Sequence, residues 1–197
     1  MKYILLAILI LQVNISTYCQ DEIIIYKKII NEYTLKNKQK NLKETSITLI
    51  IIEMPRYMRK LDDNEFSRHK RKHYKNLDEK IFVDFIKMNQ EGLNIEYFVK
   101  MNQEGIENSN YSDVNIVIIN QEQSKNREEL LTRYPNWAWN LLILEFSNIG
   151  FNENKTQALV YYGFDGGGYG IGGGFYIIFE KKRGKWKRKG VMPAWAA

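Results

Sequence analysis

The chain contains a single cysteine, Cys19, and only two histidines, His69 and His73. With one thiol, no disulfide can form within the chain, and CxxC redox centres and thiolate zinc sites are excluded by number. The histidines have the i, i+4 spacing of a metal pair on a helix, but the three residues between them are all cationic, which opposes binding of a dication. We therefore expect no metal site and interpret this basic segment as solvated surface.

Other catalytic and cofactor signatures are missing as well. The sequence has no G-x-S-x-G nucleophile elbow and no G-x-x-x-x-G-K-[ST] phosphate loop. Eight of the residues in 163–174 are glycine, and 168–173 formally fits G-x-G-x-x-G. That dinucleotide motif must lead into a helix, whereas FYIIFEKK, which follows here, has the pattern of a strand. We predict no cofactor, and a flexible or bulged loop between neighbouring strands.

No apolar run is long enough to cross a bilayer, which needs ~20 residues. The longest apolar stretch at the start, YILLAILIL over residues 3–11, follows Lys2 and precedes small or polar residues up to Cys19. This order predicts a secretory signal peptide over residues 1–19, cleaved after Cys19 or Gln20. A lipid-modified Cys19 is the less favoured alternative, because Tyr18 is bulky for the preceding position. We expect an exported protein, periplasmic or extracellular, that does not span the membrane.

Residues 20–197 have the length of one domain. Helical periodicity covers residues 21–38, and again residues 76–91, where Asn76 and Glu79 have the spacing of a capping box. Strand patterns cover residues 46–53, 114–120, 137–146 and the last quarter of the chain, where Arg183 and Gly184 allow a tight turn. The sequence predicts an α+β fold: an antiparallel sheet with a C-terminal β-meander, and the N-terminal and central helices packed on one face.

The segment FIKMNQEG at residues 85–92 returns as FVKMNQEG at residues 98–105. Two copies are fewer than the three or more that a solenoid needs. We interpret the pair as a local tandem duplication and predict that the second copy packs more loosely, as a surface hairpin or short helix.

The formal net charge of +6 is concentrated near the C-terminus, where seven of the nine residues in 181–189 are basic and none is acidic. Because an exported protein does not normally meet genomic DNA, we expect no nucleic-acid partner. Anionic lipid headgroups, lipopolysaccharide or acidic glycans of the envelope are the expected electrostatic partners. The candidate polyanion-binding residues are Lys181, Lys182, Arg183, Lys185, Lys187, Arg188 and Lys189.

A second candidate site is a small-ligand or enzymatic pocket on the concave face of the sheet. Loops on a rigid sheet often carry binding groups. Asp165 and Tyr169 are the hydrogen-bonding side chains of the glycine-rich stretch, and Tyr161 precedes them on a predicted strand. Glu145, between two apolar residues of another predicted strand, is a candidate carboxylate, although the solvated face of a strand is the preferred interpretation.

ALVYYG, the glycine-rich break and FYIIFEKKRGKWKRKGVM, with a tryptophan close to the end, resemble a recurrent group of small exported bacterial proteins. Their last strands read ALVY…G-x-G-x-Y-x-x-L-x-K-x-x-G-K-W. The resemblance covers the last third of the chain and implies export but no catalytic residue, because the group has no assigned activity. The helix followed by a meander also resembles NTF2-like and cystatin-like domains at the level of fold. We therefore expect a non-catalytic binding or accessory domain, with the pocket and the polyanion site as alternatives.

Overall fold

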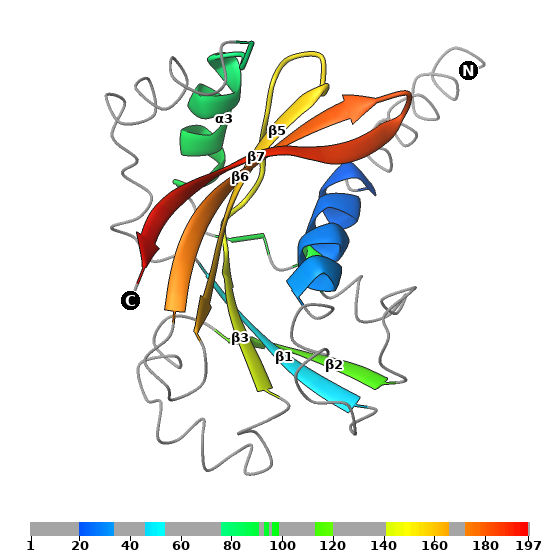
Figure 1. The fold of residues 1–197 in the computed structure, drawn as a ribbon, viewed down its shortest axis with the longest axis vertical. Helices are drawn as coiled ribbons and strands as arrows, with labels where there is room; N and C mark the ends of the chain where they lie inside the picture. Colours follow the sequence, from blue (N-terminus) through cyan, green and yellow to red (C-terminus); the bar gives the residue numbers. More distant parts are fainter. Residues whose placement is uncertain are drawn as a thin grey trace, which may run out of the picture.

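The structure, a computed structural model, describes residues 20–33, 46–53, 76–90, 93–94, 96–98, 113–119, 141–165 and 172–196. Residues 20–33 and 96–98 are helical. The remaining elements are β1 (Ser46–Glu53), α3 (Lys80–Met88), β2 (Asp113–Ile119), β3 (Leu141–Phe146), β4 (Gly150–Phe151), β5 (Gln157–Asp165), β6 (Gly172–Lys182) and β7 (Lys185–Ala196) (Figure 1).

The strands form one sheet in the order β2-β1-β3-β5-β6-β7, with the short β4 paired to β5. From β3 onward every pairing is antiparallel, which confirms the α+β fold and the C-terminal meander. One feature that the prediction did not include is that β1 runs parallel to both β2 and β3. An unbroken apolar run such as LIII in β1 is typical of a central parallel strand with both faces covered.

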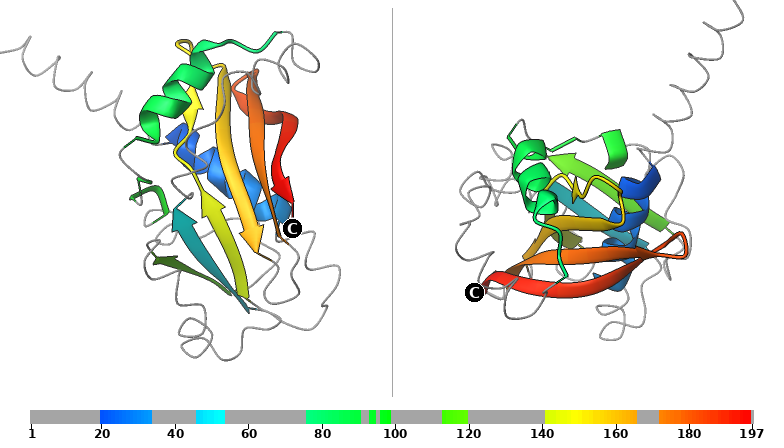
Figure 2. Two further views of the ribbon diagram at one scale, coloured as in Figure 1. Left: turned by 90° about the vertical axis from the view of Figure 1, so that its left-hand side faces the viewer. Right: turned by 90° about the horizontal axis from the view of Figure 1, so that it is seen from above.

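The hairpin between β6 and β7 is formed as predicted. Arg183 and Gly184 both have positive φ, 52° and 75°, the backbone of a two-residue turn that matches the twist of its strands. Strand β6 begins at Gly172, so the glycine-rich stretch leads into a strand and not into a helix. Two register shifts between β6 and β7 bend the pair, and the curved hairpin extends past the helix of residues 20–33 (Figure 2).

The two helices lie on opposite faces of the sheet, so the prediction that both pack on one face is wrong. The helix of residues 20–33 shares a core with Ala158 and Val160 of β5, whereas α3 shares another with Leu159 and Tyr161. Successive strand residues point to opposite faces, and all four of these are fully buried. A strand with both faces buried must be packed against other elements on each side, and here one helix packs on each side.

The start of α3 also differs from the prediction. The helix begins at Lys80, whose backbone N–H donates to Asp78 Oδ1 at 3.0 Å; Glu79 makes no side-chain capping bond, and Asn76 is exposed. Gln157 of β5 accepts a hydrogen bond from the Asp78 amide at 2.9 Å and donates one to the Asn76 carbonyl at 3.0 Å. This distant side chain holds the segment before the helix, so Asn76 does not cap it.

Each copy of the repeat begins with a phenylalanine, and both side chains are fully buried. Phe85 belongs to the core between α3 and the sheet, and Phe98 belongs to the core on the opposite face of the sheet. The Phe98 ring lies 4.7 Å from that of Tyr26 and 5.5 Å from that of Phe146, centroid to centroid. The prediction of looser packing is therefore wrong at Phe98. The rest of the second copy lies outside the described residues, as do residues 1–19, both histidines, and residues 137–140 of the strand predicted over 137–146.

Within the described ranges, no helix has both the length and the apolar character that crossing a membrane requires.

Candidate functional site

Two ion pairs join the helix of residues 20–33 to the basic hairpin. Lys181 Nζ donates to both carboxylate oxygens of Asp21 at 2.9 Å, and Trp186 Nε1 donates to the same carboxylate at 2.8 Å. Arg188 donates to Glu32 at 2.6 Å, and both of these side chains are about two-fifths exposed (41% and 43%). Two of the seven predicted polyanion-binding cations therefore bind acids of the fold.

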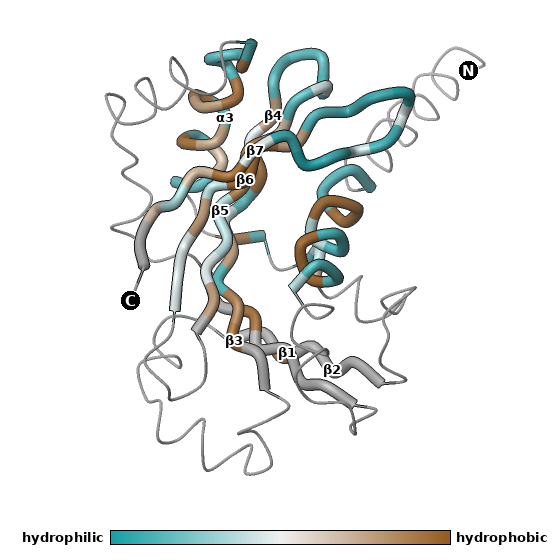
Figure 3. The backbone as a smooth tube through the Cα atoms, viewed as in Figure 1, coloured by the Kyte–Doolittle hydropathy of each residue, from teal (hydrophilic) through white to brown (hydrophobic). Residues whose placement is uncertain are grey.

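Two further cations share Glu180, whose carboxylate accepts from Lys182 and Lys189 at 2.8 Å each. These hydrogen bonds, that of Lys182 first, hold the pKa of Glu180 below its ordinary value. The last three cations lie at the tip of the hairpin, which is strongly hydrophilic (Figure 3). All three are exposed, and in the described part of the chain none of their side chains has a hydrogen bond or ion pair: Arg183, Lys185 and Lys187. We call these three residues the hairpin tip.

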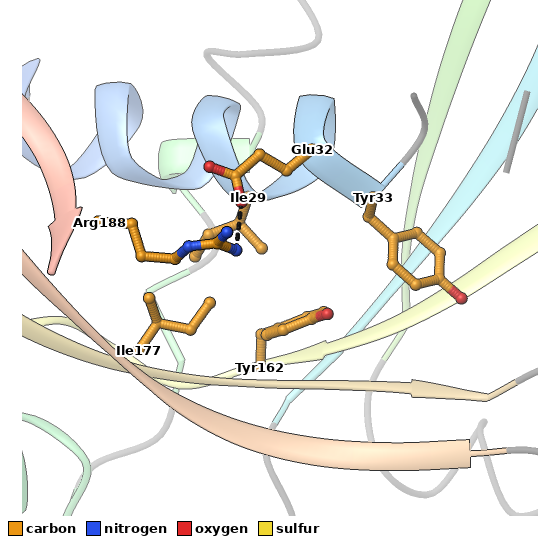
Figure 4. Close-up of a pocket in the computed structure, with 6 residues that line it drawn as sticks. All are labelled: Ile29, Glu32, Tyr33, Tyr162, Ile177 and Arg188. Atoms are coloured by element: carbon orange, nitrogen blue, oxygen red, sulfur yellow. Dashed lines mark hydrogen bonds and ion pairs between the residues drawn. The ribbon is translucent and has the colours of Figure 1, made fainter. Parts of the chain in front are cut away.

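A shallow pocket opens between the helix of residues 20–33 and the sheet. The helix contributes Ile29, Glu32 and Tyr33, and the sheet contributes Tyr162, Ile177 and Arg188 (Figure 4). The Arg188–Glu32 pair links the sheet side of the pocket to its helix side (Figure 4). Its cavity volume is about 20 Å³, close to the ~10–15 Å³ that one water molecule requires. A ligand would therefore lie across the pocket and not inside it.

Four half-buried rings continue from the pocket toward the glycine-rich end of β5 and β6. We call this set the aromatic row: Tyr33, Tyr162, Phe164 and Phe175. The planes of Phe164 and Phe175 are nearly parallel, 6° apart with centroids at 6.1 Å, and Tyr162 lies within 27° of both. Tyr33 meets them from the helix, its centroid 5.3 Å from that of Phe164.

Two local features shape the aromatic row. A Cβ at Gly173 would lie 3.2 Å from the Phe175 ring and 3.3 Å from the Phe164 ring, so glycine leaves the space that the two rings flank. Burial, with a smaller contribution from nearby Tyr33, raises the pKa of Tyr162 to about 12. The Tyr162 hydroxyl therefore keeps its proton at neutral pH and remains a hydrogen-bond donor.

The residues predicted for a small-ligand pocket are not gathered on an open surface among the described residues. Tyr161 is fully buried against α3, and its hydroxyl donates to Glu145 Oε2 at 3.1 Å. A Cβ at Gly163 would lie 2.7 Å from that oxygen, so glycine makes room for this bond. Asp165 ends β5 as the register partner of Gly172, and Tyr169 lies outside the described residues. This pocket stays a prediction.

The buried polar residues of the bend after β3 have partners within the fold. The backbone N–H of Asn148 donates to Asn89 Oδ1 at 2.7 Å, and Asn89 Nδ2 donates back to the backbone carbonyl of Asn148 at 3.1 Å. Tyr26 donates its hydroxyl hydrogen to the Ser147 carbonyl at 2.8 Å. These bonds tie both helices to the bend, and they account for the buried amides as structural groups.

A second charged cluster lies at the start of the helix of residues 20–33. Glu22 is buried, and its Oε2 has no hydrogen-bond partner among the described residues. Burial raises the pKa of Glu22, and it lowers the pKa of the nearby Lys155, whose Nζ lies 4.9 Å from the centroid of the Phe151 ring. The attraction between these two opposite charges offsets part of the cost of burying them.

Sequence reasoning missed the aromatic row and the Arg188 pocket. A period-two signal was present, because Tyr162 and Phe164 alternate along β5, but their neighbour Phe175 is fixed only by the register of β6. Among the described residues, no three His, Cys, Asp or Glu side chains are grouped so that they could hold a metal ion. No protein-family model, curated protein or solved structure matches this chain.

Proposed function

We propose that the protein is an exported, non-catalytic binding or accessory domain that attaches to an anionic surface of the cell envelope through the hairpin tip. The observation that carries the proposal is the contrast within the basic cluster. Four cations have acidic partners in the fold, and three exposed ones, Arg183, Lys185 and Lys187, have none in the described part of the chain. A partner with negative charge gains most from these three, because no internal ion pair has to break first.

The polar side chains that could suggest catalysis bond to partners within the fold, which supports a non-catalytic role. Glu145 and Tyr161 bond to each other beside α3, and the buried asparagines bond to the backbone. Each of these polar groups therefore has a partner inside the fold, as is usual for structural polar groups.

The expected contribution of the hairpin tip is large enough to measure. A basic side chain near an anionic membrane contributes ~1 kcal/mol, so three contribute about 3 kcal/mol. At about 1.4 kcal/mol per tenfold change, their loss weakens binding by roughly 100-fold. The effect falls as salt rises, because exposed charges are screened over ~10 Å at about 0.1 M ionic strength.

The test uses the purified protein with phosphatidylglycerol–phosphatidylcholine vesicles and with immobilised heparin, which separate a lipid from a glycan partner. The variant Arg183→Gln/Lys185→Gln/Lys187→Gln is expected to lose the binding. The control Lys28→Gln/Lys80→Gln/Lys87→Gln removes the same charge from exposed helix positions and is expected to keep it. Equal losses in both variants would show a diffuse effect of net charge and contradict the proposal. The proposal would also be contradicted if the unmodified protein bound neither the vesicles nor heparin.

A further inference from the structure

We infer that the aromatic row and the Arg188–Glu32 pair together form a second binding site, one that recognises a neutral saccharide. This site lies on the face of the sheet covered by the helix of residues 20–33, and it includes none of the three hairpin-tip residues.

The first observation is a change of burial along neighbouring strands. Val160 of β5 is fully buried, and on β6 Phe179 and Ile177 are 1% and 3% exposed. Toward the glycine-rich end the same face carries Tyr162, Phe164 and Phe175, which are all only half-buried. The planes of these three rings are near-parallel, so they form one stacked set that stays partly open to solvent. Aromatic faces carry negative charge density, and the C–H groups of a pyranose ring, which carry partial positive charge, are matched to such faces.

The second observation is the chemistry at the end of the aromatic row. Arg188 is a planar donor with five N–H groups, and Glu32 is a planar acceptor with two oxygens. Neighbouring sugar hydroxyls each donate and accept, so a diol can bond to both members of the pair at once. The pair is neutral as a unit and about two-fifths exposed. An anionic ligand would have to displace Glu32 and a cationic one Arg188, which favours an uncharged partner.

The third observation is the size of the pocket. A volume of about 20 Å³ cannot enclose a sugar ring, so the ligand would lie flat over the rings with its hydroxyls at the Arg188–Glu32 pair. Gly173 keeps the space between Phe164 and Phe175 clear of a side chain. The Phe164 and Phe175 rings also lie beside the backbone at Gly173. This packing leaves binding possible, since stacking of a ligand needs only one accessible ring face.

The test measures binding of the purified protein to an array of cello-, chito-, malto- and laminari-oligosaccharides, followed by calorimetric titration with the best-retained one. We expect retention of at least one of these neutral chains. Phe164→Leu and Phe175→Leu each remove one ring and are expected to weaken binding about tenfold, the order of effect for loss of one stacking ring. Arg188→Gln is expected to weaken it by a similar factor.

The control Phe82→Leu removes a buried ring from the α3 face and is expected to leave saccharide affinity unchanged, while its melting curve reports the general cost of losing a ring. The hairpin-tip triple variant should also bind the saccharide normally, which separates this inference from the proposed function. Failure of every neutral oligosaccharide to bind would overturn the inference. So would unchanged affinity in folded Phe164→Leu and Phe175→Leu variants, whatever the result with anionic vesicles.

Discussion

Removal of the Asp21 carboxylate is expected to destabilise the protein much more than removal of Glu32, although both acids lie on one helix and bind the same hairpin. Asp21 is 7% exposed and accepts from both Trp186 Nε1 and Lys181 Nζ, whereas the Glu32–Arg188 pair is open to water. The two variants Asp21→Ala and Glu32→Ala therefore compare a buried and an exposed ion pair at one interface.

The magnitude follows from what each variant leaves behind. In Asp21→Ala the indole N–H of Trp186, which is 1% exposed, loses its acceptor, at a cost of about 1–3 kcal/mol. Lys181 is 28% exposed and turns to water, so its share is only about 0.5–1 kcal/mol. The sum, about 1.5–4 kcal/mol, corresponds to a melting temperature lower by roughly 3–16 °C for a chain of this size. Glu32→Ala should cost at most about 1 kcal/mol.

The assay is thermal unfolding followed by circular dichroism, with both acids replaced in the unmodified protein and in a Trp186→Phe background. Phenylalanine lacks the indole donor, so Asp21→Ala should cost less in that background. The reasoning is refuted if the two acids have equal effects, or if the cost of Asp21→Ala is the same with and without the indole N–H.

Two further predictions concern the fold. In Gly150→Ala the new Cβ would lie 2.4 Å from the Phe85 backbone nitrogen and 2.5 Å from its Cα, so α3 must move away from β4, at a cost near or above the upper end of about 1–3 kcal/mol. Gly184→Ala meets open space and only the strain of positive φ, about 1–2 kcal/mol, so denaturant titration should rank Gly150→Ala as the less stable, and the reverse order would contradict the close approach. The pKa of Glu22, whose charged neighbours are Asp21 and Lys155, is raised above 4.5 in the folded state. The folded state therefore holds the Glu22 proton more tightly than the unfolded state, and stability is lost as pH rises from 4.5 through the folded pKa. Glu22→Gln should remove that loss and raise the melting temperature at neutral pH, and identical pH profiles for both proteins would count against the buried carboxylate.

Local patterns were sufficient for the C-terminal strands and their turn. Period-two alternation predicted β5 and β6, and the residues at the reversal, Arg183 and Gly184, adopt the positive φ that a tight turn requires. The two-sided sheet was not predicted, although ALVY of β5 was a signal for it, because four successive buried residues leave no wet face. Alternation states which residues share a face but not which helix covers that face.

The errors at the start of α3 and in the basic cluster came from partners that are distant in sequence. Asn76 has a plausible capping spacing, but its carbonyl instead accepts a hydrogen bond from Gln157, 81 residues away. Lys181 was assigned to a polyanion, and its partner Asp21 is 160 residues earlier in the chain. The charge count of the hairpin was visible in the sequence, whereas the division into paired and unpaired cations depends on these long-range contacts.

The contacts among Asp21, Lys181 and Trp186 also govern the order of events during biosynthesis. The helix of residues 20–33 packs against an indole that lies 165 residues later in the chain. Until β7 is available, Ile25, Ile29 and Ile30 lack part of the surface against which they pack, and contacts so distant in sequence form slowly. The packing of this helix is therefore complete only after β7 has been synthesised, and a product that stops before β7 would leave the apolar face of the helix open to aggregation or proteolysis.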